Sequence, residues 1–293
     1  MAMRYGVTLF ATDVSMGIVE LAQATEERGL DSLWLPEHTH IPLSRRTSPP
    51  TGGSVLAEEY KRALDPLVAL AAAASVTNRL RLGTGILLAA QREPIVTAKA
   101  VATLDHVSNG RAALGVGFGW NEDEMAHHGV PYDQRRSITR DHVRAMQALW
   151  ADDEAAYAGD HVSFSSSWSW PKPVQRNGHG RPAVPVLVGG GAGPKLFAHI
   201  AEYASGWIPI GGAGLTEALP LLRETVAAAG RDPATLEVVP FGSFPSPGKL
   251  DHFAEIGITE CVFRLPSAGR DEVLPVLDRY ADLLSQRADH RGS

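Results

Sequence analysis

The chain of 293 residues lacks the features that mark several large classes of protein. Its one cysteine, Cys261, makes neither an internal disulfide nor a thiolate metal cluster, so we expect a buried thiol in a strand. The formal charge of −6 provides no broad attraction to nucleic acid or to an anionic membrane. No apolar run approaches the roughly 20 residues of a membrane span, and the N-terminus lacks the basic and apolar regions of a signal peptide. We therefore predict a cytoplasmic protein without nucleic-acid or membrane partners.

Strands and helices are predicted to alternate along the whole chain. Eight apolar, β-branched runs predict strands at 4–10, 31–37, 80–88, 111–117, 184–190, 205–211, 236–242 and 258–265. Amphipathic segments at helical spacing lie near 15–29, 65–77, 94–108, 133–152, 192–203, 214–229, 247–256 and 270–287. Continuous apolar strands are typical of a parallel sheet covered on both sides, and eight strand–helix units close a barrel. We predict an α/β fold, a (β/α)8 TIM barrel forming one domain over 1–293, with an open doubly wound sheet as the alternative.

Two segments interrupt this alternation. The connection 38–64, after the second strand, is longer than an ordinary strand-to-helix loop and starts where barrel enzymes build their sites. We expect it to form a lid or a substrate wall, with Arg45, Arg46 and Tyr60 as candidates for substrate contact. The insertion 153–183, before the fifth strand, contains a predicted hairpin around Gly159-Asp160. It is either decoration or part of the pocket wall.

The stretch "GVGFGWNEDE" places Gly115, Gly117 and Gly119 at alternating positions at the end of the fourth predicted strand. A dinucleotide fingerprint needs a glycine at its sixth position, after the first strand of the fold, and this chain has Trp120 after the fourth. The motif is therefore not a Rossmann fingerprint. These glycines either let a bulky ligand approach the backbone or allow tight packing of the strand. The acidic run 122–124 reads as the first turn of a helix, where the macrodipole favours negative charge, with Asn121 or Glu122 facing the pocket as the alternative.

Two further glycine-rich strand ends complete this pattern. Four of residues 189–193 are glycines placed directly before a helix, where free backbone N–H groups bind phosphate, and Lys195 could add charge. We predict a phosphate site there, with an ordinary flexible turn as the alternative. Gly83 and Gly85 lie within the third strand, which is typical of a bulge or of close ligand approach. Three such ends at one face favour a planar ring system with a phosphorylated tail.

The second predicted strand ends in "LPEHTH", which contains Glu37, His38 and His40. A histidine at the carboxyl end of a barrel strand suits acid–base work near neutral pH, so His38 is the catalytic candidate. We expect His40 to cap a helix or satisfy the core, and His127 and His128 to be solvated. The His-x-His pattern also suggests a metal-dependent hydrolase, but the other strand ends carry too few ligands, so we predict no metal site.

Several of these segments together resemble the luciferase-like monooxygenase superfamily. The resemblance rests on "ERGLDSLWLPEH", "LGTGILL", "ATLDHVSNGR", "GVGFGW", "VPYDQR" and "WPKPVQ", and it covers most of the chain. The opening "PEHTHIP" resembles the branch of oxidoreductases that depend on the deazaflavin coenzyme F420. The resemblance implies a TIM barrel that holds a flavin or deazaflavin at its carboxyl-terminal mouth, usually in a homodimer. It also implies a cis peptide between Gly85 and Ile86 behind the ring.

The same resemblance implies a set of cofactor-binding residues. His38 would lie near the reacting edge of the ring, and the strand end at 188–191 would hold the phosphate. Members that oxidise a sugar phosphate carry a carboxylate where this chain has Trp120, which argues against that substrate and makes the pocket more apolar. The full set is Glu37, His38, Gly85, Ile86, Gly117, Phe118, Gly119, Trp120, Val188, Gly189, Gly190 and Gly191.

These expectations predict hydride transfer between the deazaflavin and a small organic substrate, with His38 exchanging the accompanying proton. FMN is the alternative cofactor, and it would make the protein an oxygen-dependent monooxygenase. A protein that binds the cofactor without turnover is a third reading, and only His38 argues against it.

Overall fold

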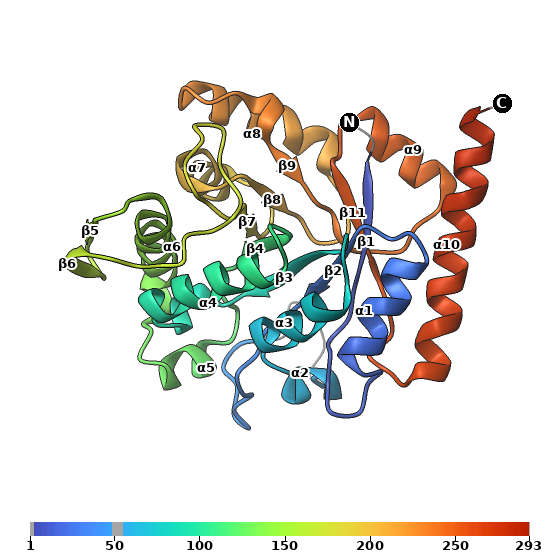
Figure 1. The fold of residues 1–293 in the computed structure, drawn as a ribbon, viewed down its shortest axis with the longest axis horizontal. Helices are drawn as coiled ribbons and strands as arrows, with labels where there is room; N and C mark the ends of the chain where they lie inside the picture. Colours follow the sequence, from blue (N-terminus) through green and yellow to red (C-terminus); the bar gives the residue numbers. More distant parts are fainter. Residues whose placement is uncertain (1–2, 49–54, 293) are drawn as a thin grey trace.

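The computed structural model describes residues 3–48 and 55–292, so residues 49–54 of the predicted 38–64 connection lie outside the described residues. Nine short strands form one curled parallel sheet in the order β10-β11-β1-β2-β3-β4-β7-β8-β9. Figure 1 shows the sheet at the centre of the molecule. The strands are β1 (Arg4–Thr8), β2 (Ser32–Leu35), β3 (Arg81–Leu87), β4 (Ala112–Val116), β7 (Val186–Gly189), β8 (Gly206–Ile208), β9 (Glu237–Val238), β10 (Phe241–Ser243) and β11 (Glu260–Arg264).

The two edge strands, β9 and β10, are consecutive pieces of one segment, 237–243. On the β8 side, Val239 N donates to the Trp207 carbonyl at 2.9 Å and Phe241 N to the Pro209 carbonyl at 2.8 Å. On the β11 side, the Pro240 carbonyl accepts from Val262 N at 3.0 Å. The segment is therefore hydrogen-bonded along both sides and joins the two edges of the sheet. The predicted α/β fold is confirmed, and this arrangement is consistent with the predicted barrel, in which 236–242 counts as one strand.

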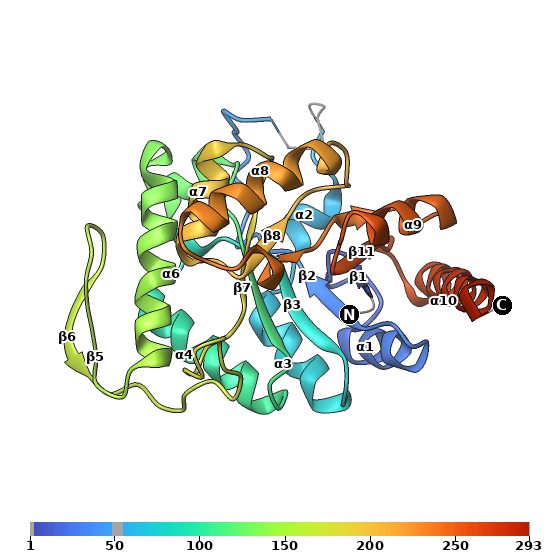
Figure 2. The same cartoon turned by 90° about the horizontal axis from the view of Figure 1, so that it is seen from above.

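Helices surround the sheet (Figures 1 and 2). They are α1 (Ile18–Glu27), α3 (Pro66–Val76), α4 (Pro94–Val107), α6 (Arg135–Ala151), α7 (Pro194–Tyr203), α8 (Leu215–Ala228), α9 (Pro247–Glu255) and α10 (Arg270–Gly292). Two short helices, α2 (Glu58–Arg62) and α5 (Glu122–His127), lie in the connections that follow β2 and β4. Figure 1 shows both on the lower side of the sheet, opposite the N-terminus and therefore at the carboxyl end of β1. No helix within the described ranges is long and apolar enough to cross a membrane.

Local sequence signals fix the start of two covering helices. Asp65 accepts hydrogen bonds from Leu67 N at 2.9 Å and Val68 N at 3.0 Å, and Pro66 occupies the first helical position of α3. Glu93 and Pro94 begin α4 in the same way. An acceptor side chain satisfies the free N–H groups of the first turn, and proline needs no partner for its missing N–H. Both starts lie within a residue of the predicted ones.

The interior of the sheet is filled by inward side chains of alternate strand positions. Trp34 is fully buried there, and a Cβ at Gly83 would lie 2.2 Å from its ring. Gly83 therefore makes room for a side chain of the protein. The interior cluster consists of Trp34, Ala113, Leu187, Ile208, Val239 and Val262, with Ile86 and Phe241 packed against it.

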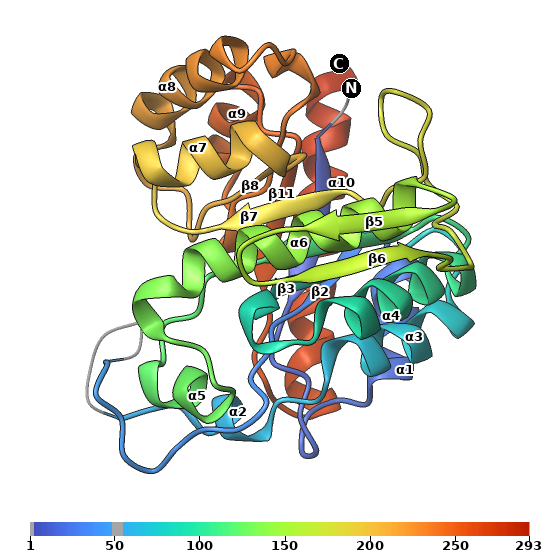
Figure 3. The same cartoon turned by 90° about the vertical axis from the view of Figure 1, so that its left-hand side faces the viewer.

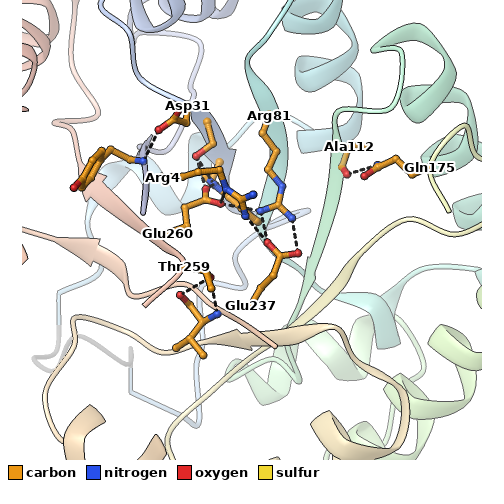
Figure 4. A network of polar contacts seen from close by, with 12 residues as sticks. Arg4, Asp31, Arg81, Ala112, Gln175, Glu237, Thr259 and Glu260 are labelled. Carbon is orange, nitrogen blue, oxygen red and sulfur yellow. Dashed lines mark hydrogen bonds and ion pairs between the residues drawn. The ribbon is translucent and has the colours of Figure 1, made fainter. Parts of the chain in front are cut away.

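Charged side chains form a network at the amino-terminal ends of the strands (Figure 4). Arg4 meets Glu260 at 3.0 Å and Glu237 at 2.5 Å, while Arg81 meets Glu237 at 2.7 Å and Glu260 at 2.8 Å. Burial favours the neutral acid, but the Arg81 and Arg4 guanidiniums outweigh it and hold the pKa of Glu260 below its ordinary value. The other Glu260 oxygen accepts from the Trp34 ring nitrogen at 2.8 Å. This end of the barrel is thus filled by paired charges.

The predicted hairpin around Gly159-Asp160 is confirmed. Strands β5 (Ala155–Ala158) and β6 (Ser163–Ser167) pair antiparallel outside the main sheet, beside α6 (Figure 3). Asp141 on α6 accepts from the Tyr157 hydroxyl at 3.0 Å and from His161 N at 2.7 Å. No residue of 153–183 lines the cavity described below, which favours the decorative reading of this insertion.

Cys261 is buried in β11, as predicted, and burial raises its pKa to about 12. A thiol held in this neutral form is a poor nucleophile. Cys261 is therefore a packing residue of the strand.

Candidate functional site

A cavity of about 430 Å³ lies at the carboxyl ends of the strands. Its wall includes residues at or directly after the ends of β1, β2, β3, β4, β7, β8, β10 and β11, so almost every strand of the sheet contributes. Ligand sites in parallel α/β proteins form at this end of the strands. Most of the lining is apolar, and its large apolar side chains are Leu9, Phe10, Ile86, Leu88, Phe118, Trp120, Ile208, Ile210, Phe241 and Leu265.

The cavity brings together most of the residues proposed from the sequence. Three of the twelve do not line it: Gly117, Val188 and Gly191. Val188 is fully buried in β7, and Gly191 is exposed in the turn that follows. The residues that line it are Glu37, His38, Gly85, Ile86, Phe118, Gly119, Trp120, Gly189 and Gly190.

The glycines of β4 allow close packing between strands. A Cβ at Gly115 would lie 2.2 Å from the Thr84 carbonyl oxygen, and a Cβ at Gly117 would lie 1.6 Å from the Ile86 side chain. For these two positions the tight-packing alternative is therefore the one the structure supports, because protein atoms occupy the vacated space. Gly119 differs, since its φ of 77° lies in the left-handed region that glycine adopts most easily.

The peptide between Gly85 and Ile86 is cis, as the resemblance predicted. A Cβ at Gly85 would lie 2.2 Å from the Phe241 ring. The Ile86 side chain fills the space beside Gly117 and Gly189. Gly85, Ile86 and Phe241 therefore form a closely packed floor between the interior cluster and the cavity.

His38 forms a buried pair with Glu124. Its Nδ1 lies 2.8 Å from Glu124 Oε2, and the two side chains are 6% and 1% exposed. A carboxylate at this distance accepts a hydrogen bond from Nδ1, and in the tautomer that makes this bond Nε2 is the acceptor nitrogen. His38 lines the cavity, and among the described residues no hydrogen-bond partner of its Nε2 was found. The pair therefore holds one imidazole nitrogen ready for a ligand.

The sequence around α5 explains how Glu124 reaches this position. Asn121 caps the helix by accepting from Glu124 N, so Glu124 is the third helical residue. Its side chain turns inward, while Glu122 and Asp123 of the same turn pair with Arg46 at the surface. The acidic run was expected to be a helix-start charge cluster, and all three of its members do lie in the first turn of α5. The role of Glu124 was missed.

Aromatic rings surround the imidazole of His38. Its centroid lies 5.4 Å from that of Tyr60, 5.8 Å from Trp120 and 6.5 Å from Phe10. Tyr60, on α2, lines the cavity as expected for a substrate-contact residue. Arg45 and Arg46 do not line it, because Arg45 donates to the Pro42 carbonyl and Arg46 pairs with α5.

Glu37 has a structural role at the edge of the cavity. One carboxylate oxygen accepts from Leu88 N at 2.7 Å and the other from Arg92 Nε at 2.6 Å. Arg92 also reaches Asp65 at 2.5 Å. Glu37 therefore ties the end of β2 to the segment after β3, and its charge is already paired.

The other three histidines considered in the sequence, His40, His127 and His128, meet at the surface. His40 Nε2 lies 2.9 Å from His127 Nδ1, and His128 Nε2 lies 2.8 Å from the Thr39 hydroxyl. All three histidines are exposed. The expectation of a capping or core role for His40 was therefore wrong, whereas His127 and His128 are solvated as expected. Within the described ranges, no three His, Cys, Asp or Glu side chains are arranged to hold a metal ion.

Two arginines at the start of α6 also line the cavity, and the sequence did not single them out. Arg135 stacks on the Tyr132 ring at 3.8 Å and donates to the Tyr132 carbonyl at 2.6 Å. Arg136 lies over the Phe118 ring at 4.4 Å. Neither is in an ion pair in the part of the chain that the structure describes. The only visible signal was their adjacency in "VPYDQRR".

A family model described as luciferase-like monooxygenase matches residues 7–248. The chain belongs to the luciferase-like monooxygenase family. This match confirms the resemblance and identifies the protein as an enzyme of that family. The cavity, the His38–Glu124 pair and the cis peptide are therefore features of a luciferase-like enzyme.

Relatives of this luciferase-like protein include enzymes that use coenzyme F420. An uncharacterised protein of Mycobacterium tuberculosis is 43% identical over 286 residues, 97% of this chain and 99% of that relative. An F420-dependent glucose-6-phosphate dehydrogenase of Kineococcus radiotolerans is 30% identical over 226 residues, 73% of this chain and 59% of the dehydrogenase. The structure of an F420-dependent secondary alcohol dehydrogenase in complex with an F420-acetone adduct shares the fold, with a TM-score of 0.76, 18% identity and coverage of 97% and 98%.

Proposed function

We propose that this protein is a coenzyme F420-dependent oxidoreductase that transfers a hydride between the deazaflavin and a small, largely apolar organic molecule. The observation that carries the proposal is the His38–Glu124 pair, which faces an apolar cavity at the carboxyl end of the sheet. A buried carboxylate that fixes one imidazole nitrogen is a common arrangement for proton exchange. The F420-dependent relatives support the choice of cofactor.

The residues present fit a planar ring with an anionic tail. Ile86 and Phe241 give the cavity an apolar floor, and Phe118 and Trp120 add aromatic walls. Such walls suit an extended aromatic ring, because they bury its faces without leaving polar atoms unpaired. Gly189 and Gly190 at the end of β7 provide backbone at the side where the tail would lie. When bound, a deazaflavin supplies a ring carbon that gives or takes a hydride.

In this reaction, the side chains of the protein transfer one proton. In our proposal, His38 Nε2 takes the hydroxyl proton of an alcohol as it is oxidised, or returns it to a carbonyl as it is reduced. Glu124 keeps the Nδ1 proton in place and stabilises the imidazolium that results. The rings of Phe10, Tyr60 and Trp120 around His38 exclude water from this exchange.

Trp120 argues against a sugar phosphate, the substrate of some relatives, as the substrate of this protein. It stands where the resemblance places a carboxylate in enzymes that oxidise a sugar phosphate, and it lies 5.8 Å from His38 between ring centroids. An indole at this point favours apolar contact over hydrogen bonds to sugar hydroxyls. We therefore propose an alcohol or ketone of low polarity as the substrate class. A homodimer and a cytoplasmic location stay predictions.

The second candidate is an FMN-dependent monooxygenase, which the description of the matched family favours. It would use the same cavity and the same apolar walls. The two candidates differ in whether reduced cofactor reacts with oxygen, so they are separated by cofactor and by oxygen consumption.

The test is a turnover screen with both cofactors. Oxidised coenzyme F420 is mixed with a panel of alcohols, and the reduced coenzyme with the matching ketones, while the absorbance of the coenzyme is followed. We expect turnover with wild type, and we expect the His38→Asn variant to bind the coenzyme and lose turnover. Oxygen uptake with reduced FMN, together with no reaction of coenzyme F420, would overturn the proposal in favour of the monooxygenase.

A further inference from the structure

The seam between α6 and α7, beside the cavity, collects buried polar atoms that have no hydrogen-bond partner. Thr139 is fully buried and Tyr203 is 7% exposed, so their hydroxyls are removed from bulk water. Buried polar atoms without partners are rare in folded proteins and indicate a missing ligand or water. The atoms are Arg135 Nε, Arg136 Nη1 and Thr139 Oγ1 on α6, and His199 Nδ1 and the Tyr203 hydroxyl on α7.

A chain of ring contacts connects this seam to the cavity. Arg136 lies over the ring of Phe118, which lines the cavity, and the Phe118 centroid is 5.1 Å from that of His199. His199 is in turn 5.7 Å from the Tyr203 ring. The donors Arg136, His199 and Tyr203 are therefore linked by ring contacts to the cavity wall at Phe118.

Arg135 and Arg136 have no carboxylate partner among the described residues. Arg135 and Arg136 are adjacent, and both lie in the first turn of α6, where the helix macrodipole disfavours positive charge. Further along the same helix, Arg140 and Arg144 pair with Glu202 at 2.5 Å and 2.8 Å. Burial lowers the pKa of Arg136, and the neighbouring charge of Arg135 lowers it further. Two cations without an acid, placed beside unpartnered donors, are the composition of an anion site.

We infer that the α6–α7 seam binds the phosphate group in the tail of the flavin-type cofactor, with Arg135 and Arg136 as its charged donors. This inference rests on the proposed function, because it assumes that such a cofactor occupies the cavity. It deepens that proposal by moving the main phosphate contacts from the backbone of residues 188–191 to side chains on α6 and α7. Arg136 would reach the anion over the Phe118 ring, and Thr139, His199 and Tyr203 would complete the donor set.

The test uses ligand pairs that share a ring and differ in the phosphate. The first pair is riboflavin and FMN, which differ only in the phosphate; the second is the 8-hydroxy-5-deazaflavin with its ribityl chain, which lacks the phosphate and the rest of the tail, and coenzyme F420. Dissociation constants are measured for wild type, Arg135→Met, Arg136→Met and the control Arg140→Met, whose side chain pairs with Glu202 outside the cavity. Methionine keeps an unbranched apolar stem against the neighbouring ring and removes the charged guanidinium with its N–H donors.

Wild type should prefer the phosphorylated member of the pair whose ring it binds. In Arg136→Met and Arg135→Met this preference should fall by about 10- to 100-fold, the worth of a hydrogen bond to a charged group. Affinity for the ring-only member should be unchanged, which also shows that the variants fold. Arg140→Met should behave as wild type.

Three results would overturn the inference. The first is no phosphate preference in wild type, and the second is a preference that survives both arginine substitutions. The third is an equal loss of affinity for both members of a pair, which would give Arg136 a packing role only. Failure of wild type to bind any of the four ligands would instead contradict the proposed function, so the two failures are distinguishable.

Discussion

Two pairs of arginines at opposite ends of the sheet differ in whether a carboxylate is their partner. At the amino-terminal end, Arg4 and Arg81 share Glu237 and Glu260, so each of these two guanidiniums has a carboxylate partner. At the carboxyl end, Arg135 and Arg136 line the cavity without an ion pair among the described residues. The first pair of arginines is part of a closed network (Figure 4), and the second is directed at a space that a ligand can enter.

This difference separates charges that serve the fold from charges that serve binding. Removing a member of a buried, complete network leaves another charge without a partner, which is costly. Removing a cation that has no partner in the free protein costs the fold little and affects only what binds there. Removing a charge should therefore lower the free energy of unfolding at the amino-terminal end. At the carboxyl end it should lower the affinity for a ligand.

The largest effect is expected at the closed end. Glu260→Gln keeps the shape of the side chain but leaves Arg4 and Arg81 with Glu237 as their only carboxylate in the network. We expect the free energy of unfolding in urea to fall by about 3–5 kcal/mol. The matched control is Glu202→Gln, which removes a carboxylate that is half-exposed and should cost less than about 1 kcal/mol. Equal losses in the two variants would contradict the comparison.

The next effect concerns Glu124, a buried carboxylate at the open end. Glu124→Gln should lower turnover about 10- to 100-fold, since it weakens the hydrogen bond that fixes His38 Nδ1. It should leave cofactor affinity within about threefold, because Glu124 does not line the cavity. Its pH–rate profile should shift, whereas loss of packing alone would lower the rate equally at every pH. Asp123→Asn on the same helix turn is the control.

A third substitution, Arg136→Met, should hardly change the free energy of unfolding, in contrast to Glu260→Gln. Arg136→Met removes an unpaired charge from the start of α6, where the macrodipole disfavours it by about 0.3–1 kcal/mol. The unfolding free energy of the ligand-free variant should therefore stay the same or rise slightly. A loss above about 1 kcal/mol would show that Arg136 stabilises the fold, as Arg4 and Arg81 do at the other end.

The smallest effect is a pH dependence at the seam. Burial lowers the pKa of His199, and Arg136 and Arg140 lower it further while Glu202 opposes them. The unfolded chain takes up a proton at the ordinary histidine pKa of about 6.5, so this group costs stability as pH falls below that value. His199→Phe removes the cost. The difference in unfolding free energy between variant and wild type should grow in favour of the variant from pH 7 to pH 5, and a constant difference would contradict this assignment.

Much of the barrel could be predicted from the sequence because its strands are continuous apolar runs. The runs 80–88 and 111–117 correspond to β3 and β4 within a residue or two. Pro240 divides the run 236–242 into β9 and β10, since it has no N–H for the ladder. Helix α2 was not predicted and α5 was indicated only by its acidic first turn, because five or six residues are too few for a helical period to be recognised.

A residue of the candidate site could be predicted where a reactive side chain directly follows a predicted strand. His38 stood out because a histidine directly after a strand is uncommon and chemically capable. Glu124 did not, since sequence spacing alone cannot tell which member of an acidic turn faces inward. The pair Arg135 and Arg136 became visible only when the fold placed the start of α6 beside Phe118 without an acid nearby.

The most direct test of the central claim is a titration of the wild-type protein with coenzyme F420 and with FMN, followed by tryptophan fluorescence. Trp120 lines the cavity, so a ring bound there should quench it, and Trp120→Phe should remove most of that signal. We predict saturable quenching at one equivalent of coenzyme F420, with weaker binding of FMN. Quenching by neither cofactor, or quenching that is unchanged in Trp120→Phe, would contradict a flavin-type site at the open end of the barrel.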